Sequence, residues 1–250
     1  MATSGTTTFN PSVDEIIEEA YERTNIRGTR TGYQLKSARR SLNILLSEWG
    51  NRGIHLWKIK LASVPLVEGQ ALYNWTSDTT NFPTDISDVL EAYVRNNTTA
   101  TAPVDTALSK IDRSTYSALP NKLSKGTPSQ YYVQRQAYVR NAAGTITASP
   151  NIYLYTTPSS SFSGANYKVN FYYMAQLEDV GAYTNTSDVI FRFYPALISG
   201  LAYYLSIKYS PERTADLKMI YEDELARAVA EDGQRTSTYI TPQTFYGDGV

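Results

Sequence analysis

The sequence predicts an α+β protein in which the two chain ends form a discontinuous helical bundle, with an inserted antiparallel β domain and an extended C-terminal tail. Apolar residues recur three and four positions apart near both ends, which is helical spacing. Between residues 54 and 179 this spacing gives way to short β-branched and aromatic runs, separated by Gly, Pro, Ser, Thr and Asn. The expected boundaries are residues 1–55 and 185–235 for the helical domain, 56–184 for the β-rich domain and 236–250 for the tail.

Two helices are predicted near the N-terminus. The first covers residues 10–24, where Ser12 and Glu15 form the Ser-x-x-Glu pattern of a capping box. The second begins where Thr31 and Gln34 repeat this pattern. Their apolar stripes are Val13, Ile16, Ile17, Ala20 and Tyr21 in the first helix, and Leu35, Ala38, Leu42, Leu45, Leu46 and Trp49 in the second.

Two more helices are predicted near the C-terminus. One begins at Pro195, which suits a first helical turn, and the other begins at Ser210-Pro211-Glu212 and ends at Asp232-Gly233. The following tail has no periodicity, so we expect it to be extended or to become ordered only against a neighbouring protein. The large apolar residues that could anchor this tail are Tyr239, Ile240, Phe245 and Tyr246.

The central region predicts a set of strands. In residues 167–173, apolar and polar residues nearly alternate, which indicates a strand with one buried and one solvated face. The expected strands are residues 56–64, 69–74, 89–96, 131–140, 152–156 and 167–174.

Composition argues against most catalytic chemistry. The chain has no cysteine, so disulfides, thiolate metal sites and cysteine nucleophiles are excluded. It has one histidine, His55, which lies among apolar residues and is interpreted as a structural side chain. No phosphate-binding glycine motif occurs, and we expect no cofactor, no metal site and no enzymatic activity. No apolar run approaches the roughly 18 residues of a membrane span, and residues 1–10 do not resemble a signal peptide.

Several carboxylates in the β region leave an alternative open. Asp78, Asp85, Asp88 and Glu91 could suggest a glycosidase pair or a calcium loop, but the calcium-loop spacing is missing. Roles in turns and helix caps are the preferred interpretation. If the protein instead cleaved cell-wall glycan, the catalytic pair would come from Asp78, Asp85, Asp88, Asp105 and Asp112.

Charge is distributed in blocks, although the formal net charge is only −1. The first helix is acidic, whereas the turn after it and the start of the second helix are basic. This order complements the helix dipole, but it would also let an acidic face of one subunit meet a basic face of the next. The candidate interface residues are Glu15, Glu18, Glu22, Arg27, Arg30, Arg39 and Arg40. The 21 tyrosines suit either buried interfaces or β structure.

Several stretches follow one another in an order seen in a known family. The most characteristic covers residues 40–57, with Leu42-Asn43, Glu48-Trp49-Gly50 and Leu56-Trp57. The others are Gly28-Thr29-Arg30-Thr31-Gly32, Leu119-Pro120-Asn121-Lys122, Gly126-Thr127-Pro128-Ser129-Gln130-Tyr131-Tyr132-Val133, Tyr194-Pro195-Ala196-Leu197, Gly200-Leu201-Ala202-Tyr203-Tyr204-Leu205 and Ser210-Pro211-Glu212-Arg213. In these stretches the chain resembles the head-to-tail adaptor (connector) proteins of short-tailed bacteriophages.

The resemblance implies a structural protein of the virion neck or tail, assembled in the host cytoplasm. It implies a homo-oligomer, a dodecameric ring beneath the portal protein, with the tail nozzle protein and tail fibres attached to it. Genome DNA would pass through the lumen without sequence-specific binding. A β-sandwich module that binds a host-surface glycan remains the alternative from a different functional class.

Overall fold

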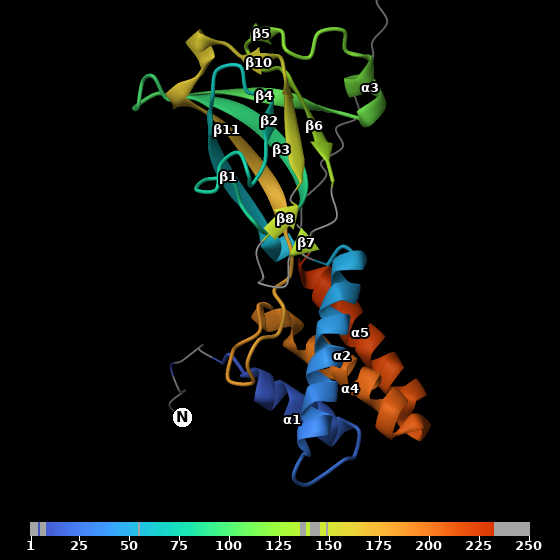
Figure 1. Ribbon diagram of the computed structural model, residues 1–250. Coiled ribbons are helices and arrows are strands. Elements are labelled where there is room, and N and C mark those ends of the chain that lie inside the picture. The colour runs from blue at the N-terminus through green and yellow to red at the C-terminus, as the bar shows by residue number, and fades with distance from the viewer. Residues whose placement is uncertain are drawn as a thin grey trace, which may run out of the picture. The chain divides into compact units, whose positions relative to one another are not determined.

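The computed structural model describes residue 5 and residues 9–54, 56–135, 139–140, 146–148 and 150–232 (Figure 1). These residues divide into two compact units. The described residues up to 42 and from 182 onward form the helical unit, and those between 43 and 181 form the β unit. His55 and the four expected tail anchors, Tyr239, Ile240, Phe245 and Tyr246, lie outside the described residues.

The helical unit combines helices from both ends of the chain, as predicted. Its elements are α1 (Val13–Arg23), α4 (Tyr194–Tyr209), α5 (Thr214–Asp232) and the first part of α2 (Gly32–Asn51). Helix α4 is the central helix and packs against both α1 and α5. Its side chains are buried on several faces, including Leu197, Leu201 and Leu205, which are fully buried.

Both predicted capping boxes are present. At α1, the Glu15 backbone N–H donates to Ser12 Oγ (3.4 Å) and the Ser12 N–H donates to the Glu15 carboxylate (2.7 Å). At α2, the Gln34 N–H donates to Thr31 Oγ1 (3.3 Å) and the Thr31 N–H donates to Gln34 Oε1 (2.9 Å). Each pair satisfies two backbone donors that have no partner within the helix.

Hydrogen bonds join the two chain ends within the helical unit. The Val13 N–H donates to the Asn185 carbonyl (2.9 Å), and the Tyr194 hydroxyl donates to Asn10 Oδ1 (2.6 Å). Near the C-terminal end of α4, Lys208 Nζ donates to Ser41 Oγ (2.7 Å) on α2. Because these bonds connect residues far apart in sequence, they fix α1 and α2 against the C-terminal helices.

The β unit contains one curled seven-stranded sheet, with strand order β1-β11-β3-β4-β6-β9-β2. Five neighbouring pairs are antiparallel and one, β4 with β6, is parallel, so the sheet is mixed rather than purely antiparallel. Its strands are β1 (Ile59–Leu66), β2 (Leu72–Tyr73), β3 (Ile86–Asn96), β4 (Val104–Ile111), β6 (Gln130–Gln134), β9 (Asn151–Tyr155) and β11 (Gly164–Ala175). Two smaller sheets pair β5 (Lys125–Gly126) with β10 (Thr157–Pro158), and β7 (Val139–Arg140) with β8 (Ile146–Ala148).

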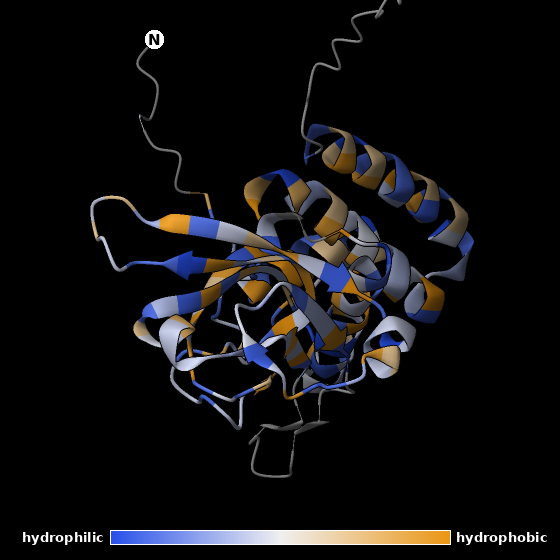
Figure 2. Ribbon diagram, turned by 90° about the horizontal axis from the view of Figure 1, so that it is seen from above, coloured by the Kyte–Doolittle hydropathy of each residue, from blue (hydrophilic) through white to orange (hydrophobic). Residues whose placement is uncertain are grey.

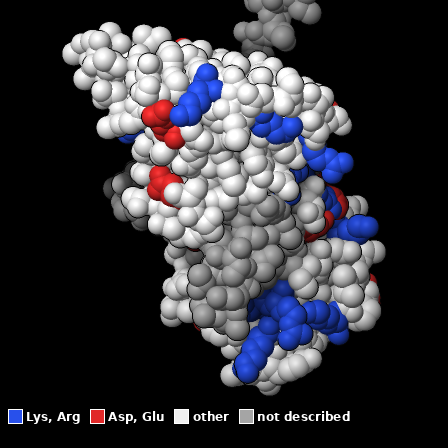
Figure 3. Space-filling model, turned by 45° about the horizontal axis from the view of Figure 1, so that its top comes forward, with Lys and Arg blue, Asp and Glu red and all other residues white. Residues whose placement is uncertain are grey.

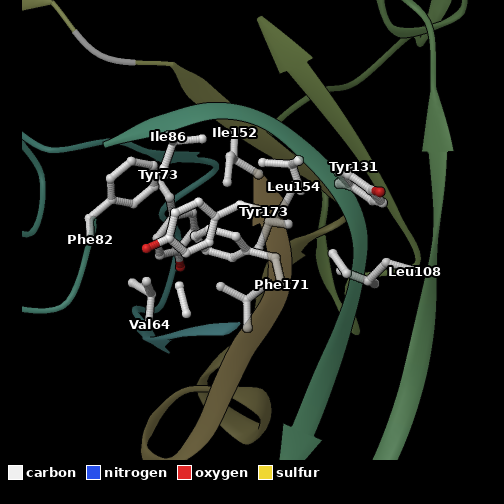
Figure 4. Close-up of a cluster of buried hydrophobic side chains, with 14 of the residues drawn as sticks. Val64, Tyr73, Phe82, Ile86, Leu108, Tyr131, Ile152, Leu154, Phe171 and Tyr173 are labelled. Atoms are coloured by element: carbon white, nitrogen blue, oxygen red, sulfur yellow. The ribbon is translucent and has the colours of Figure 1, made fainter. Parts of the chain in front are cut away.

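The curled sheet encloses a core of apolar and aromatic side chains (Figure 4). Polar and apolar residues alternate along its strands (Figure 2). In β11 the alternation places Val169, Phe171 and Tyr173 in this core, and Asn170 is the exception because it is polar yet buried. Burial raises the pKa of Tyr73, another core residue, to about 12 although its oxygen accepts a hydrogen bond from the Val67 N–H.

The hairpin between β3 and β4 extends beyond the region in which β4 pairs with β6. That parallel pairing begins at Ser109, whereas β4 pairs with β3 from Val104 onward. The four residues from Val104 to Ala107 are all exposed, and one side of their backbone has no strand partner among the described residues. This part of β4 is therefore an open sheet edge in the described structure.

Candidate interaction surfaces

The acidic face of α1 is formed by three of the predicted interface residues. Glu15, Glu18 and Glu22 are exposed and follow one another at spacings of three and four, so they share one face of the helix. Glu15 also accepts the capping bond at the helix start. Glu18 and Glu22 form no ion pair with any described residue, so no described residue neutralises their charges.

The predicted basic residues divide into two groups. Arg30 lies over the Tyr21 ring (4.8 Å from guanidinium carbon to ring centroid) and donates to the Gly28 carbonyl (2.7 Å). Arg39 lies over the Tyr183 ring at 5.7 Å. These two side chains therefore have contacts within their own unit.

Arg27 and Arg40 are exposed and have no acidic partner within the described part of the chain. Lys36 lies one turn before Arg40 on α2 and is also exposed. On the face that Figure 3 shows, Lys and Arg side chains gather in one group over the helices. The helical unit thus carries acidic and basic surfaces that do not neutralise each other.

Two apolar features of the helical unit were not predicted from the sequence. Tyr33, on the first turn of α2, is 76% exposed. A shallow pocket of about 330 Å³ lies beside α1. Its lining residues are Phe9, Pro11, Glu15, Ile16, Glu19 and Ile198.

Two of the aspartates considered as catalytic candidates cap local structure, as expected. Asp112 accepts a hydrogen bond from the Thr115 N–H (2.7 Å) at the start of α3 (Arg113–Ala118). Asp78 accepts bonds from the N–H groups of Thr80 and Asn81. The Thr115 bond lowers the pKa of Asp112, and at Asp78 the bonds from Asn81 and Thr80 lower the pKa against the opposing effect of burial.

The other three aspartates form ion pairs. Asp85 pairs with Lys60 (2.8 Å), and Asp105 forms a two-pronged pair with Arg95, both distances being 2.7 Å. Asp88 pairs with Lys110 (3.6 Å) and with Arg135. Burial acts to raise the pKa of Asp88, but the Arg135 hydrogen bond and the Lys110 charge lower it overall.

A general acid needs a raised pKa, so the lowered pKa values of Asp78, Asp88, Asp105 and Asp112 do not favour catalysis. Among the described residues, no group of three or more His, Cys, Asp or Glu side chains could hold a metal ion. In the same part of the chain, none of the helices combines the length and apolar character needed to cross a membrane.

Tyrosines form a cluster on the β unit. Tyr116, Tyr132 and Tyr153 are partly buried, with ring centroids 5.2 to 5.8 Å apart. Lys122 Nζ lies 5.5 Å from the Tyr116 ring centroid, and the Tyr153 hydroxyl donates to Gln134 Oε1 (3.1 Å). Because the three tyrosine rings pack against one another, much of their apolar surface is buried within the β unit.

The chain combines helices from both of its ends with an inserted curled sheet, and its candidate aspartates are held in caps and ion pairs. This arrangement favours an adaptor, a protein that acts by assembly. The family model for the SU10 adaptor protein matches residues 11–244. The chain therefore belongs to the SU10 adaptor family and is a structural head–tail adaptor protein of a phage, whose partners are other virion proteins. A comparison with curated proteins gave no match.

Proposed function

We propose that this adaptor forms a ring between the portal protein and the tail nozzle and fibres, and that genome DNA passes through its lumen. Family membership over residues 11–244 carries this proposal, because adaptors of this family join head to tail. The resemblance noted in the sequence suggests twelve copies. The helical domain, residues 1–55 and 185–235, would build the ring, and residues 56–184 would project from it.

Lateral contacts in this ring would join the acidic and basic surfaces of neighbouring copies. A ring requires heterologous contacts, in which two different patches of the subunit meet. The exposed Glu18 and Glu22 on α1, and Arg27 and Arg40 on or before α2, provide two such patches of opposite sign. Glu15, Arg30 and Arg39 border the same patches while also making contacts within the subunit.

The C-terminal tail would bind the portal protein or an adjacent subunit. Tyr239, Ile240, Phe245 and Tyr246 supply apolar and aromatic anchors of the kind that dominate binding at interfaces. The tail carries few charged residues, so its binding would depend mainly on these anchors.

The charge balance suits a DNA conduit. Each phosphate contact adds affinity, so a strongly basic lumen would retain the genome. With 23 basic and 24 acidic residues, the chain has no general excess of positive charge.

Imaging of the virion neck tests the proposal directly. We expect closed rings of this chain in contact with the portal on one side and the tail on the other. Purified chain mixed with purified portal should also form a large complex in analytical ultracentrifugation. A chain that forms no ring in the neck, or that never binds portal, would contradict the proposed function.

Glycan binding by the β unit is the second candidate. The seven strands form one curled sheet, whereas a β-sandwich consists of two facing sheets. The cluster of Tyr116, Tyr132 and Tyr153 is the feature that favours sugar binding, because aromatic rings offer apolar surfaces to sugars. A glycan array probed with the full chain distinguishes the two functions, since the adaptor alone predicts no signal.

A further inference from the structure

Tyr33 is a large, exposed aromatic side chain in a basic surrounding. It lies on the first turn of α2, and Lys36 and Arg40 follow it three and seven positions later, on the same face of the helix. Tyr33 is 76% exposed, and neither it nor Lys36 or Arg40 has an ion pair or ring contact with a described residue. An aromatic residue that protrudes with no partner, among uncompensated charges, is typical of an interface anchor.

The pocket beside α1 is complementary to the Tyr33 patch, because it combines apolar walls with acidic residues. Phe9, Pro11, Ile16 and Ile198 give it apolar walls, and Glu15 and Glu19 add carboxylates at the same site. Phe9 is itself 68% exposed, so the apolar wall is accessible. Glu18 and Glu22 extend the negative charge along α1.

The two patches occupy different places on the same compact unit. The Tyr21 hydroxyl donates to the Gln34 carbonyl (2.8 Å), which fixes the first turns of α2 against the last part of α1. The pocket lies along the first half of α1, around Glu15 and Ile16. Since the rise per residue is about 1.5 Å, Glu15 and Tyr21 are separated by about 9 Å along the helix axis.

We propose that Tyr33 of one copy inserts into the Phe9–Pro11–Ile16–Ile198 pocket of a second copy, while Lys36 and Arg40 face Glu18 and Glu22 of that copy. This inference rests on the proposed ring and specifies its lateral contact. The ring of Tyr33 has an apolar body for the pocket walls and a hydroxyl that can donate to the Glu15 or Glu19 carboxylate. The spacing of the charges matches as well, because Glu18–Glu22 and Lys36–Arg40 are both one helical turn apart.

The contact is heterologous, since the inserted side chain and the pocket are different parts of the surface. Each copy therefore offers one free Tyr33 and one free pocket, and successive copies can join until the ring closes. A two-fold dimer would use the same pair of patches twice and would stop at two copies.

Photo-crosslinking tests the contact while keeping an aromatic ring at position 33. The full chain is made with benzoylphenylalanine in place of Tyr33, assembled with portal protein, irradiated and analysed by mass spectrometry. We expect crosslinks between subunits to residues 9–19 or to Ile198. The matched control carries the same photoreactive residue in place of Met219, which is 69% exposed on α5, and should give no crosslink to the pocket.

Substitutions at position 33 measure how much the Tyr33 side chain contributes to association between copies. Tyr33→Ala should weaken association by at least about tenfold, as expected for an interface anchor, with an unchanged circular dichroism spectrum. Tyr33→Phe should weaken it less, because only the hydroxyl is lost. Met219→Ala serves as the exposed control and should leave association unchanged.

Charge reversal provides a rescue that a folding defect would not show. The double variant K36E/R40E should fail to associate, and adding E18K/E22K to the same chain should restore association. Rings that form normally with Tyr33→Ala, or crosslinks that map away from the pocket, would overturn this contact but leave the proposed ring intact. If the chain formed no ring with portal protein, both the proposed ring and this contact would be overturned.

Discussion

The Ser12 hydroxyl contributes to stability through a single backbone bond at the start of α1. Replacing it with alanine leaves that donor without its capping partner, so Ser12→Ala should lower the free energy of unfolding by about 1 kcal/mol. The control is Ser47→Ala, an exposed position within α2, which should have little effect. Urea denaturation of both variants provides the measurement, and equal midpoints for Ser12→Ala and the parent chain would refute the capping role.

Asp88 gives the β unit a defined response to acid. Its pKa is lower in the folded chain than in the unfolded chain, so its ion pairs stabilise the fold above about pH 4 and lose this effect as the pH falls further. Asp88→Asn should therefore destabilise the protein by about 1 kcal/mol at pH 7, since its partners are partly exposed. The difference from the parent chain should shrink between about pH 5 and pH 2.

Urea denaturation across this pH range checks the acid response. Glu91→Gln is the matched control, because Glu91 is an exposed carboxylate on the same strand with no ion pair to a described residue. A constant difference between Asp88→Asn and the parent chain at every pH would show that the carboxylate charge is not responsible.

At the scale of elements, α4 holds the helical unit together. Leu201 is fully buried at its centre, so Leu201→Ala should lower the free energy of unfolding by about 2–5 kcal/mol through lost contacts and a cavity. Ile207 lies on the same helix but is 51% exposed, and Ile207→Ala should cost about 1 kcal/mol or less. Thermal unfolding of the two variants provides the comparison. Similar losses of unfolding free energy in both would contradict the central position of α4.

The sequence predicted the long helices and the fold class well, because each helix has strong local signals. The capping pairs at Ser12 and Thr31 and the apolar stripes recur at fixed spacing, independently of distant residues. Strand β4 was missed, since Leu108 is its only buried side chain and neighbouring strands supply its stabilisation. Its parallel pairing with β6 depends on the crossover through residues 112–129, which local patterns do not specify.

The candidate surfaces were predictable only in part. Charge blocks such as Glu15–Glu22 are visible in the sequence, because helical spacing alone decides which residues share a face. Contacts such as that of Arg30 with Tyr21 were not predicted, since they depend on how the chain turns back after α1. The pocket beside α1 combines Phe9 with Ile198, which meet only through folding. Tyr33 could have been noticed, because it falls outside the apolar stripe of its helix.

At the scale of the whole molecule, assembly should depend on salt. Opposite charges on neighbouring copies attract less as ionic strength rises, and the screening length falls from about 10 Å at 0.1 M to about 3 Å at 1 M. Association of the parent chain into the proposed ring should therefore weaken with added salt in sedimentation experiments. The double variant E18Q/E22Q should associate more weakly and respond less to salt, and an equal response would argue against charge pairing.

The open edge of β4 affects how the free subunit behaves before it joins a virion. Ser109 donates its N–H to the Ser129 carbonyl, so by strand alternation Asp105 and Ala107 direct their backbone groups toward the uncovered side. Such an edge can pair with a strand of another chain and so start aggregation. A charged residue or a proline on the edge opposes this pairing. Pro103 and the Asp105–Arg95 pair occupy these protective positions. The Asp105→Val variant should thus scatter light increasingly as its concentration rises, whereas solutions of the Asp105→Lys variant should remain clear.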